Sequence, residues 1–243
     1  MTFSIKKSFK DSWSIFTSKK FYLPFILVSF VAIIGLYIVF GASGFLSTVL
    51  LLRGLWWVMI PLLALFLFLG VYFILVNINL SLVAYKTKEV HFKKSFSSVW
   101  NFKLIAKTTG LLLLVGGGAL IIGYLLSLGL SKIHPILGIS AFIVWVAYVA
   151  VRLAFSVYIL VDSKETIINS MKKSHTMMKG NGWKFLLFII CVSILSAVVQ
   201  IITSRIGFIS PILSEIVVII FGIALAPWFS LLTVSPYLQL KSH

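Results

Sequence analysis

The sequence predicts an all-α, polytopic membrane protein with six transmembrane helices and three short cytoplasmic amphipathic helices, in a single domain of residues 1–243. Three observations lead to this fold class. Hydrophobic residues make up 60% of the chain and charged residues only 11%, whereas an average globular chain carries about 25% charged residues. Six charge-free runs are long enough to cross a bilayer. The 21 Lys and Arg residues outnumber the 5 Asp and Glu residues. Most of them gather before the first run, between the second and third runs, and between the fourth and fifth runs.

The six charge-free runs define the expected spans, because a span takes about 20 consecutive apolar residues. In chain order, the runs hold 32, 32, 24, 19, 20 and 25 residues between charged side chains. We therefore expect transmembrane helices at about 21–41, 55–84, 104–127, 139–161, 184–203 and 214–238. A membrane β-barrel would alternate polar and apolar residues along each strand, and the runs show no such alternation.

The distribution of cations predicts the orientation of these spans. Segments 1–20, 86–107 and 164–184, together with Lys241, hold 17 Lys residues, whereas the opposite ends of the spans hold three cations. Because cytoplasmic loops carry the excess of Lys and Arg, both termini are expected in the cytoplasm. Trp residues precede the first, third and fifth spans on this side, where indole rings favour the headgroup level.

Each of the three basic segments has apolar residues at helical spacing, as in Ile5, Phe9, Trp13 and Phe16. This pattern predicts short helices that lie in the membrane interface. The expected contacts with anionic phospholipid of the cytoplasmic leaflet are Lys6, Lys7, Lys10, Trp13, Lys93, Lys94, Trp100, Lys172, Lys173 and Trp183. The alternative is that the lysines serve only to orient the chain.

The basic segments also align with one another, which suggests a threefold internal repeat. Ser8-Phe9-x-x-Ser12-Trp13 matches Ser95-Phe96-x-x-Val99-Trp100 and Ser170-Met171-x-x-Ser174-His175. Each of these motifs is followed by two spans, so the expected units are about 1–85, 86–161 and 162–243. The alternative is that basic amphipathic segments of any membrane protein would align this well.

Arg152 is the most unusual residue of the predicted spans. Ten residues separate it from Asp162, which places it about 15 Å deep if the helix between them is continuous. Other polar residues are expected at a similar depth, and together they would form one polar layer: Asn77, Asn79, Ser193 and Ser230. Two interpretations stay open, a structural layer that fixes helix packing and a site for an anion or lipid headgroup.

Five glycines in the third expected span, Gly110, Gly116, Gly117, Gly118 and Gly123, predict close helix packing, with a gate or a dimer face as alternatives. The histidines His91, His134, His175 and His243 are scattered, and Cys191 is the only cysteine, so we expect no metal site. No catalytic motif is present, and we expect no catalytic residues, no cofactor and no nucleic-acid partner.

The stretch from Arg152 through Asp162, Ser170 and Gly180 to Trp183 resembles a group of bacterial six-helix membrane proteins. These proteins are related to the membrane domain of glycerophosphoryl diester phosphodiesterase. The opening Ser8-Phe9-Lys10-Asp11-Ser12-Trp13 resembles the same family's N-terminus, whereas Thr166 replaces the Ala that the family usually has. The resemblance implies a bacterial plasma (inner) membrane location. The few residues after the sixth span leave no room for the phosphodiesterase domain, so its activity is not expected here.

Together these observations predict a non-enzymatic integral membrane protein that interacts with lipid or with a protein partner whose identity the sequence leaves open. The alternative is a transporter or channel subunit with a mid-membrane polar site around Arg152. A transporter should have a water-filled cavity that reaches this residue. Proton-coupled transport is disfavoured, because the expected spans place no carboxylate in mid-membrane.

Overall fold

A computed structural model describes residues 3–87, 92–207 and 211–241, and the described residues form helices joined by short turns. The three short helices are α1 (Ile5–Phe16), α4 (Phe92–Ser97) and α8 (Ile167–Met178). The remaining helices are α2 (Lys19–Leu52), α3 (Trp56–Thr87), α5 (Phe102–Ser131), α6 (Pro135–Leu153), α7 (Ser156–Ser163), α9 (Gly182–Gly207) and α10 (Pro211–Lys241). The predicted all-helical fold class is therefore confirmed for this part of the chain.

Within the described residues, four segments are long and apolar enough to cross a membrane, which indicates a membrane protein. They are Trp57–Thr87, Phe102–Ser131, Pro135–Ser163 and Gly182–Ile202. The third of them combines α6 and α7, so the fourth expected span is interrupted by a break. The first and sixth expected spans fall in α2 and α10, and many side chains of these two helices lie outside the described set. The total of six spans therefore stays a prediction.

Local sequence signals explain where several helices begin and turn. The side chains of Ser4, Asn101 and Thr166 each accept a backbone N–H at the start of α1, α5 and α8, which satisfies donors that a helix leaves unpaired. Gly54 and Gly180 have φ values of +70° and +81° in the turns before α3 and α9. Glycine adopts this left-handed conformation without steric cost.

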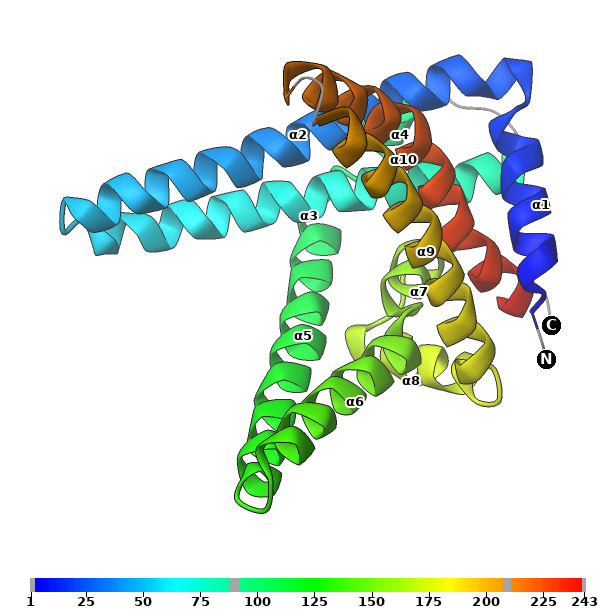
Figure 1. The fold of residues 1–243 in the computed structure, drawn as a ribbon. Helices are drawn as coiled ribbons and strands as arrows, with labels where there is room; N and C mark the ends of the chain where they lie inside the picture. Colours follow the sequence, from blue (N-terminus) through cyan, green and yellow to red (C-terminus); the bar gives the residue numbers. More distant parts are fainter. Residues whose placement is uncertain (1–2, 88–91, 208–210, 242–243) are drawn as a thin grey trace.

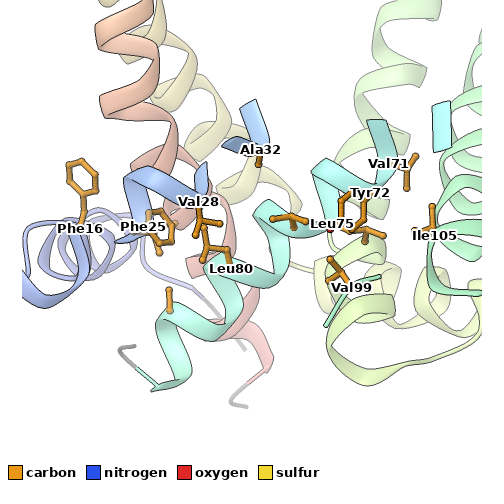
Figure 2. Close-up of a cluster of buried hydrophobic side chains, with 13 residues drawn as sticks. Phe16, Phe25, Val28, Ala32, Val71, Tyr72, Leu75, Leu80, Val99 and Ile105 are labelled. Atoms are coloured by element: carbon orange, nitrogen blue, oxygen red, sulfur yellow. The ribbon is translucent and has the colours of Figure 1, made fainter. Parts of the chain in front are cut away.

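The long helices pair as three hairpins, α2–α3, α5–α6 and α9–α10. The hairpins diverge from a common base, by which we mean the region where the ends of α3, α7 and α10 meet the short helices. In Figure 1 the first hairpin extends to the left, the second downwards and the third towards the top of the view. The buried side chains gather where the hairpins meet. One cluster lies along the second half of α3, with Val28, Leu75 and Leu80 at its centre (Figure 2). A second cluster joins α3, α7, α8, α9 and α10 around Phe155 and Tyr237.

The glycines of α5 and α6 divide into tightly packed and open positions. A Cβ atom at Gly123 would lie 3.0 Å from the ring of Phe142, and one at Gly138 would lie 2.7 Å from the carbonyl oxygen of Ser127. In contrast, Cβ atoms at Gly116, Gly117 and Gly118 would meet nothing within 4 Å. The predicted close packing of α5 therefore holds at Gly123, while these three glycines face away from the described side chains.

Each short helix packs against the outgoing helix of a hairpin: α4 against α3 and α8 against α6 and α7, in the hairpin that precedes each, and α1 against α10 of the last hairpin. The third aligned position of the sequence motif is buried in every case, as Ser12, Val99 and Ser174. The next aligned position is exposed, as Trp13, Trp100 and His175. This common pattern agrees with the proposed repeat, which stays a prediction.

Candidate functional site

The carboxylate of Asp162 joins the ends of three helices at the base of the molecule. Its side chain is only 3% exposed, and it pairs with the amino groups of Lys86, at the end of α3, and Lys241, at the end of α10. The hydroxyl of Tyr237 donates a third hydrogen bond to it, at 2.9 Å. This Asp162 junction draws together the outgoing helices of all three hairpins, and with them the basic segments next to those ends.

The two ends of the chain also meet at the base. The side-chain oxygen of Gln239 accepts the backbone N–H of Ser4 at 2.9 Å, and its side-chain nitrogen donates to the hydroxyl of Ser8 at 3.0 Å. Ser8 and Ser12 are fully buried. Ser8 and Ser12 therefore lie on the packed face of α1, where their small side chains let α1 approach α10 closely (Figure 1).

The break between α6 and α7 is filled by the hydroxyl of Ser174 from α8. This hydroxyl accepts the backbone N–H of Phe155 at 3.1 Å and donates to the carbonyl oxygen of Arg152 at 3.0 Å. In a continuous helix these two backbone groups would bond to other turns of the same helix. An inserted side chain is a known cause of helix kinks, and here it explains the break.

The side chain of Arg152 is half-buried beside the break. Its guanidinium carbon lies 5.4 Å from the centre of the Tyr148 ring, a cation–π contact. Its Nη1 atom is buried and has no hydrogen-bond partner within the part of the chain that the structure describes. The hydrogen bond from Ser174 brings the Arg152 carbonyl next to α8, and the depth of this residue in a membrane stays a prediction.

The other residues of the expected polar layer have separate partners. The amide of Asn77 donates to the carbonyl oxygen of Phe73 in its own helix, at 3.2 Å, and that of Asn79 donates to Ser98, at 2.8 Å. Ser193 is exposed, and the carbonyl of Ser230 accepts a hydrogen bond from Thr233. Among the described residues, none of these side chains is hydrogen-bonded to Arg152, so the layer stays a prediction.

The expected lipid contacts are exposed at the base of the hairpins. Exposed Lys side chains are found on all three short helices, as Lys6, Lys7, Lys10, Lys93, Lys172 and Lys173. Lys94 belongs to α4, but its side chain is outside the described set. Trp13, Trp100 and Trp183 are 51%, 63% and 71% exposed. The base therefore presents aromatic rings and ammonium groups together.

A cavity of about 480 Å³ opens between α3, the start of α5 and the end of α7. Its lining includes Lys103, Lys107 and Lys164 together with the amides of Asn79 and Asn101. Sequence reasoning missed this cavity. Asn101, Lys103 and Lys107 carry a readable signal, a helix cap followed by two cations one turn apart, but nothing in the sequence brings Lys164 to them.

The described residues contain no group of three or more His, Cys, Asp or Glu side chains that could hold a metal ion. His91 and His243 lie outside these residues. Searches against family models, curated proteins and solved structures found no match for the chain.

Proposed function

We propose that the chain is a non-enzymatic, multi-pass protein of a bacterial plasma membrane, with both termini in the cytoplasm, and that it binds anionic phospholipid through the base of its hairpins. The observation that carries this proposal is the exposure of Trp and Lys side chains near one another, on the short helices and in the segments that follow them. Trp anchors a surface at the headgroup level, and Lys is attracted by anionic headgroups there. The relation to the six-helix bacterial family is part of the same proposal.

The electrostatic balance of the base supports lipid binding. Two of its acids are already engaged, since Asp162 pairs with Lys86 and Lys241, and Glu165 pairs with Lys173. Most of the other Lys residues in the basic segments have no Asp or Glu close to them in the sequence. Each Lys near an anionic leaflet contributes about 1 kcal/mol. Several such contacts give substantial enrichment of anionic lipid around the protein.

The proposed orientation follows from the same charges. The ends of the chain and the ends of α3, α7 and α10 meet at the base, next to the cation-rich segments. Lys132, in contrast, lies at the far tip of the α5–α6 hairpin, which Figure 1 shows pointing away from the base. The positive-inside rule then assigns the base to the cytoplasm.

The proposal is tested by the lipids that surround the whole protein. Purified protein is reconstituted into nanodiscs from equal amounts of phosphatidylglycerol and phosphatidylcholine, and the lipid in the protein-containing discs is quantified. We expect enrichment of phosphatidylglycerol that falls as salt is raised and that falls in a variant with Lys6, Lys7 and Lys10 replaced by Gln. The matched control is Lys132→Gln, which should keep the enrichment. Equal recovery of both lipids at low salt would contradict the proposal.

A second candidate function, a transporter or channel subunit, is favoured by one observation. The Nη1 atom of Arg152 is buried without a partner beside a broken helix, and broken helices line the substrate sites of many transporters. The variant Arg152→Leu separates the two interpretations of this residue. Unchanged thermal stability combined with the loss of a co-purifying anion or lipid would support a site, whereas loss of stability alone would support a structural role.

A further inference from the structure

We infer that the cavity between α3, α5 and α7 is a specific site for the phosphate group of one anionic phospholipid. Three lysines line it, Lys103 and Lys107 on α5 and Lys164 at the end of α7. Apolar side chains of Leu104 and Val161 form other parts of its wall. The cavity therefore combines a cationic lining with apolar surface, which suits a lipid headgroup and the glycerol that follows it.

The charge inside the cavity is not neutralised by its own acid. Glu165 lines the cavity, but its carboxylate pairs with Lys173, and this hydrogen bond and charge hold the pKa of Glu165 below its usual range. Lys107 donates to the backbone carbonyl of Glu165 at 3.4 Å. Among the described residues, Lys103 and Lys164 form no ion pair. An anion that enters thus meets lysines of the lining, while the carboxylate of Glu165 is paired with Lys173.

The backbone at Lys164 is a second, independent observation. Its φ value of 53° lies in the left-handed region, and in the part of the chain that the structure describes it is the only such residue other than glycine. Left-handed conformation at a residue with a side chain carries strain, and such strain is concentrated at binding and catalytic sites. Glycine would form the same turn without strain, so the turn alone does not require a lysine here.

The start of α5 adds to the positive potential. Asn101 caps this helix of 30 residues, and Asn101, Lys103 and Leu104 all line the cavity. The N-terminus of a helix carries a partial positive charge and attracts phosphate. The aligned positions of the other two repeat units lack the pair of lysines, since Lys103 corresponds to Phe16 and Met178. We therefore expect one site in each chain.

This inference rests on the proposed function, because it assigns one lipid of the same class to one cavity. The test uses the full-length protein in a neutral detergent, where no bilayer is present, and measures binding of short-chain phosphatidylglycerol by native mass spectrometry and calorimetry. The site variants are Lys164→Gly and the pair Lys103→Gln with Lys107→Gln. Lys132→Gln is the charge-matched control.

We expect one saturable lipid in the wild type and in Lys132→Gln. Each neutralised lysine should weaken binding roughly fivefold, so that the double variant loses about 25-fold. Lys164→Gly is the decisive variant, because glycine accepts the left-handed turn, so that the thermal unfolding midpoint should not fall while binding does.

Wild-type affinity in both site variants would overturn the inference, even if anionic lipid is still enriched in nanodiscs. Displacement of the lipid by inorganic phosphate at equal concentration would also overturn it, since the cavity would then recognise free phosphate. If phosphatidylglycerol is not enriched in nanodiscs but one lipid still binds saturably in detergent, the result would instead contradict the proposed function alone.

Discussion

Ser174 shows how one hydroxyl can replace two backbone hydrogen bonds in a helix to which it does not belong. It is fully buried on α8, and it satisfies both the N–H of Phe155 and the carbonyl of Arg152. Serine suits this position because its hydroxyl donates one hydrogen bond and accepts another, in a volume small enough for α8 to approach the break.

We predict that Ser174→Ala lowers the free energy of unfolding by about 1–3 kcal/mol, because it leaves a buried backbone N–H without an acceptor. The measurement is unfolding of the purified protein in mixed micelles by increasing amounts of sodium dodecyl sulfate. Thr176→Ala, on the exposed face of the same helix, is the control and should change stability by less than about 0.5 kcal/mol. Equal effects of the two substitutions would contradict the assigned role of Ser174.

At the scale of elements, the Asp162 junction makes the ends of α3, α7 and α10 depend on one carboxylate. The acid is buried, whereas the side chains of Lys86 and Lys241 are 51% and 45% exposed. The carboxylate and the two lysines therefore differ in their access to water. A lysine that loses the acid can be hydrated again, but the carboxylate cannot be hydrated without opening the junction.

This asymmetry predicts an order of stability among charge variants. Replacing both Lys86 and Lys241 by Gln should cost about 3–5 kcal/mol, because the buried carboxylate loses both of its cations. Asp162→Asn should cost less, about 1–3 kcal/mol, since the lysines can return to water. The same micelle titration measures both, with Lys172→Gln combined with Lys179→Gln as the exposed control. The reverse order would show that the carboxylate is not the buried member of the junction.

The α5–α6 hairpin predicts opposite effects for two Gly→Ala substitutions. Gly138→Ala should destabilise by about 1–3 kcal/mol, because its Cβ would lie 2.7 Å from the carbonyl oxygen of Ser127. Gly117→Ala, where the Cβ meets nothing within 4 Å, should be neutral or stabilise by up to about 1 kcal/mol. Thermal unfolding in detergent compares the two variants. A large loss of stability with Gly117→Ala at high protein concentration would reveal a contact between chains.

Whether the sequence predicts an element depends on how far apart along the chain the residues that determine it are. Hydropathy runs and helix caps are local, so the short helices and the spans within the described residues were predicted close to their observed positions. The break in the fourth span was not predicted, because it depends on Ser174, 19 residues beyond Phe155. The cavity was missed for the same reason, since folding alone brings Lys164 next to Lys103 and Lys107.

At the scale of the whole molecule, the predicted orientation can be tested by labelling two sites. Cysteine is introduced at Lys132 or at Lys179, both exposed, in a chain that carries Cys191→Ser. A membrane-impermeant maleimide should label position 132 in intact cells and position 179 only after permeabilisation, because the base is expected in the cytoplasm. Labelling at 179 in intact cells would reject the orientation and, with it, the proposed access to lipid of the inner leaflet.

The divergence of the hairpins leaves most of their apolar surface uncovered by the protein itself. In the span Pro135–Ser163 only 6% of the most apolar window is buried, and in Phe102–Ser131 17%. Helix α3, with 32 residues, is about 48 Å long, whereas the hydrocarbon core is about 30 Å thick. Helices of this length fit a bilayer by tilting or by extending into the headgroups, and divergent hairpins accommodate such tilts.

The hydrogen bonds of Gln239 with Ser4 and Ser8 also determine how late α1 can dock on α10 during synthesis of the chain. They join residues that are 235 and 231 positions apart, so they cannot form until the ribosome has synthesised Gln239. At about 5–20 residues per second, the first helix waits roughly 10–50 s for its partner. Helix α1 therefore leaves the ribosome long before it can dock on α10, and any nascent chain that stalls before Gln239 leaves α1 without that anchor.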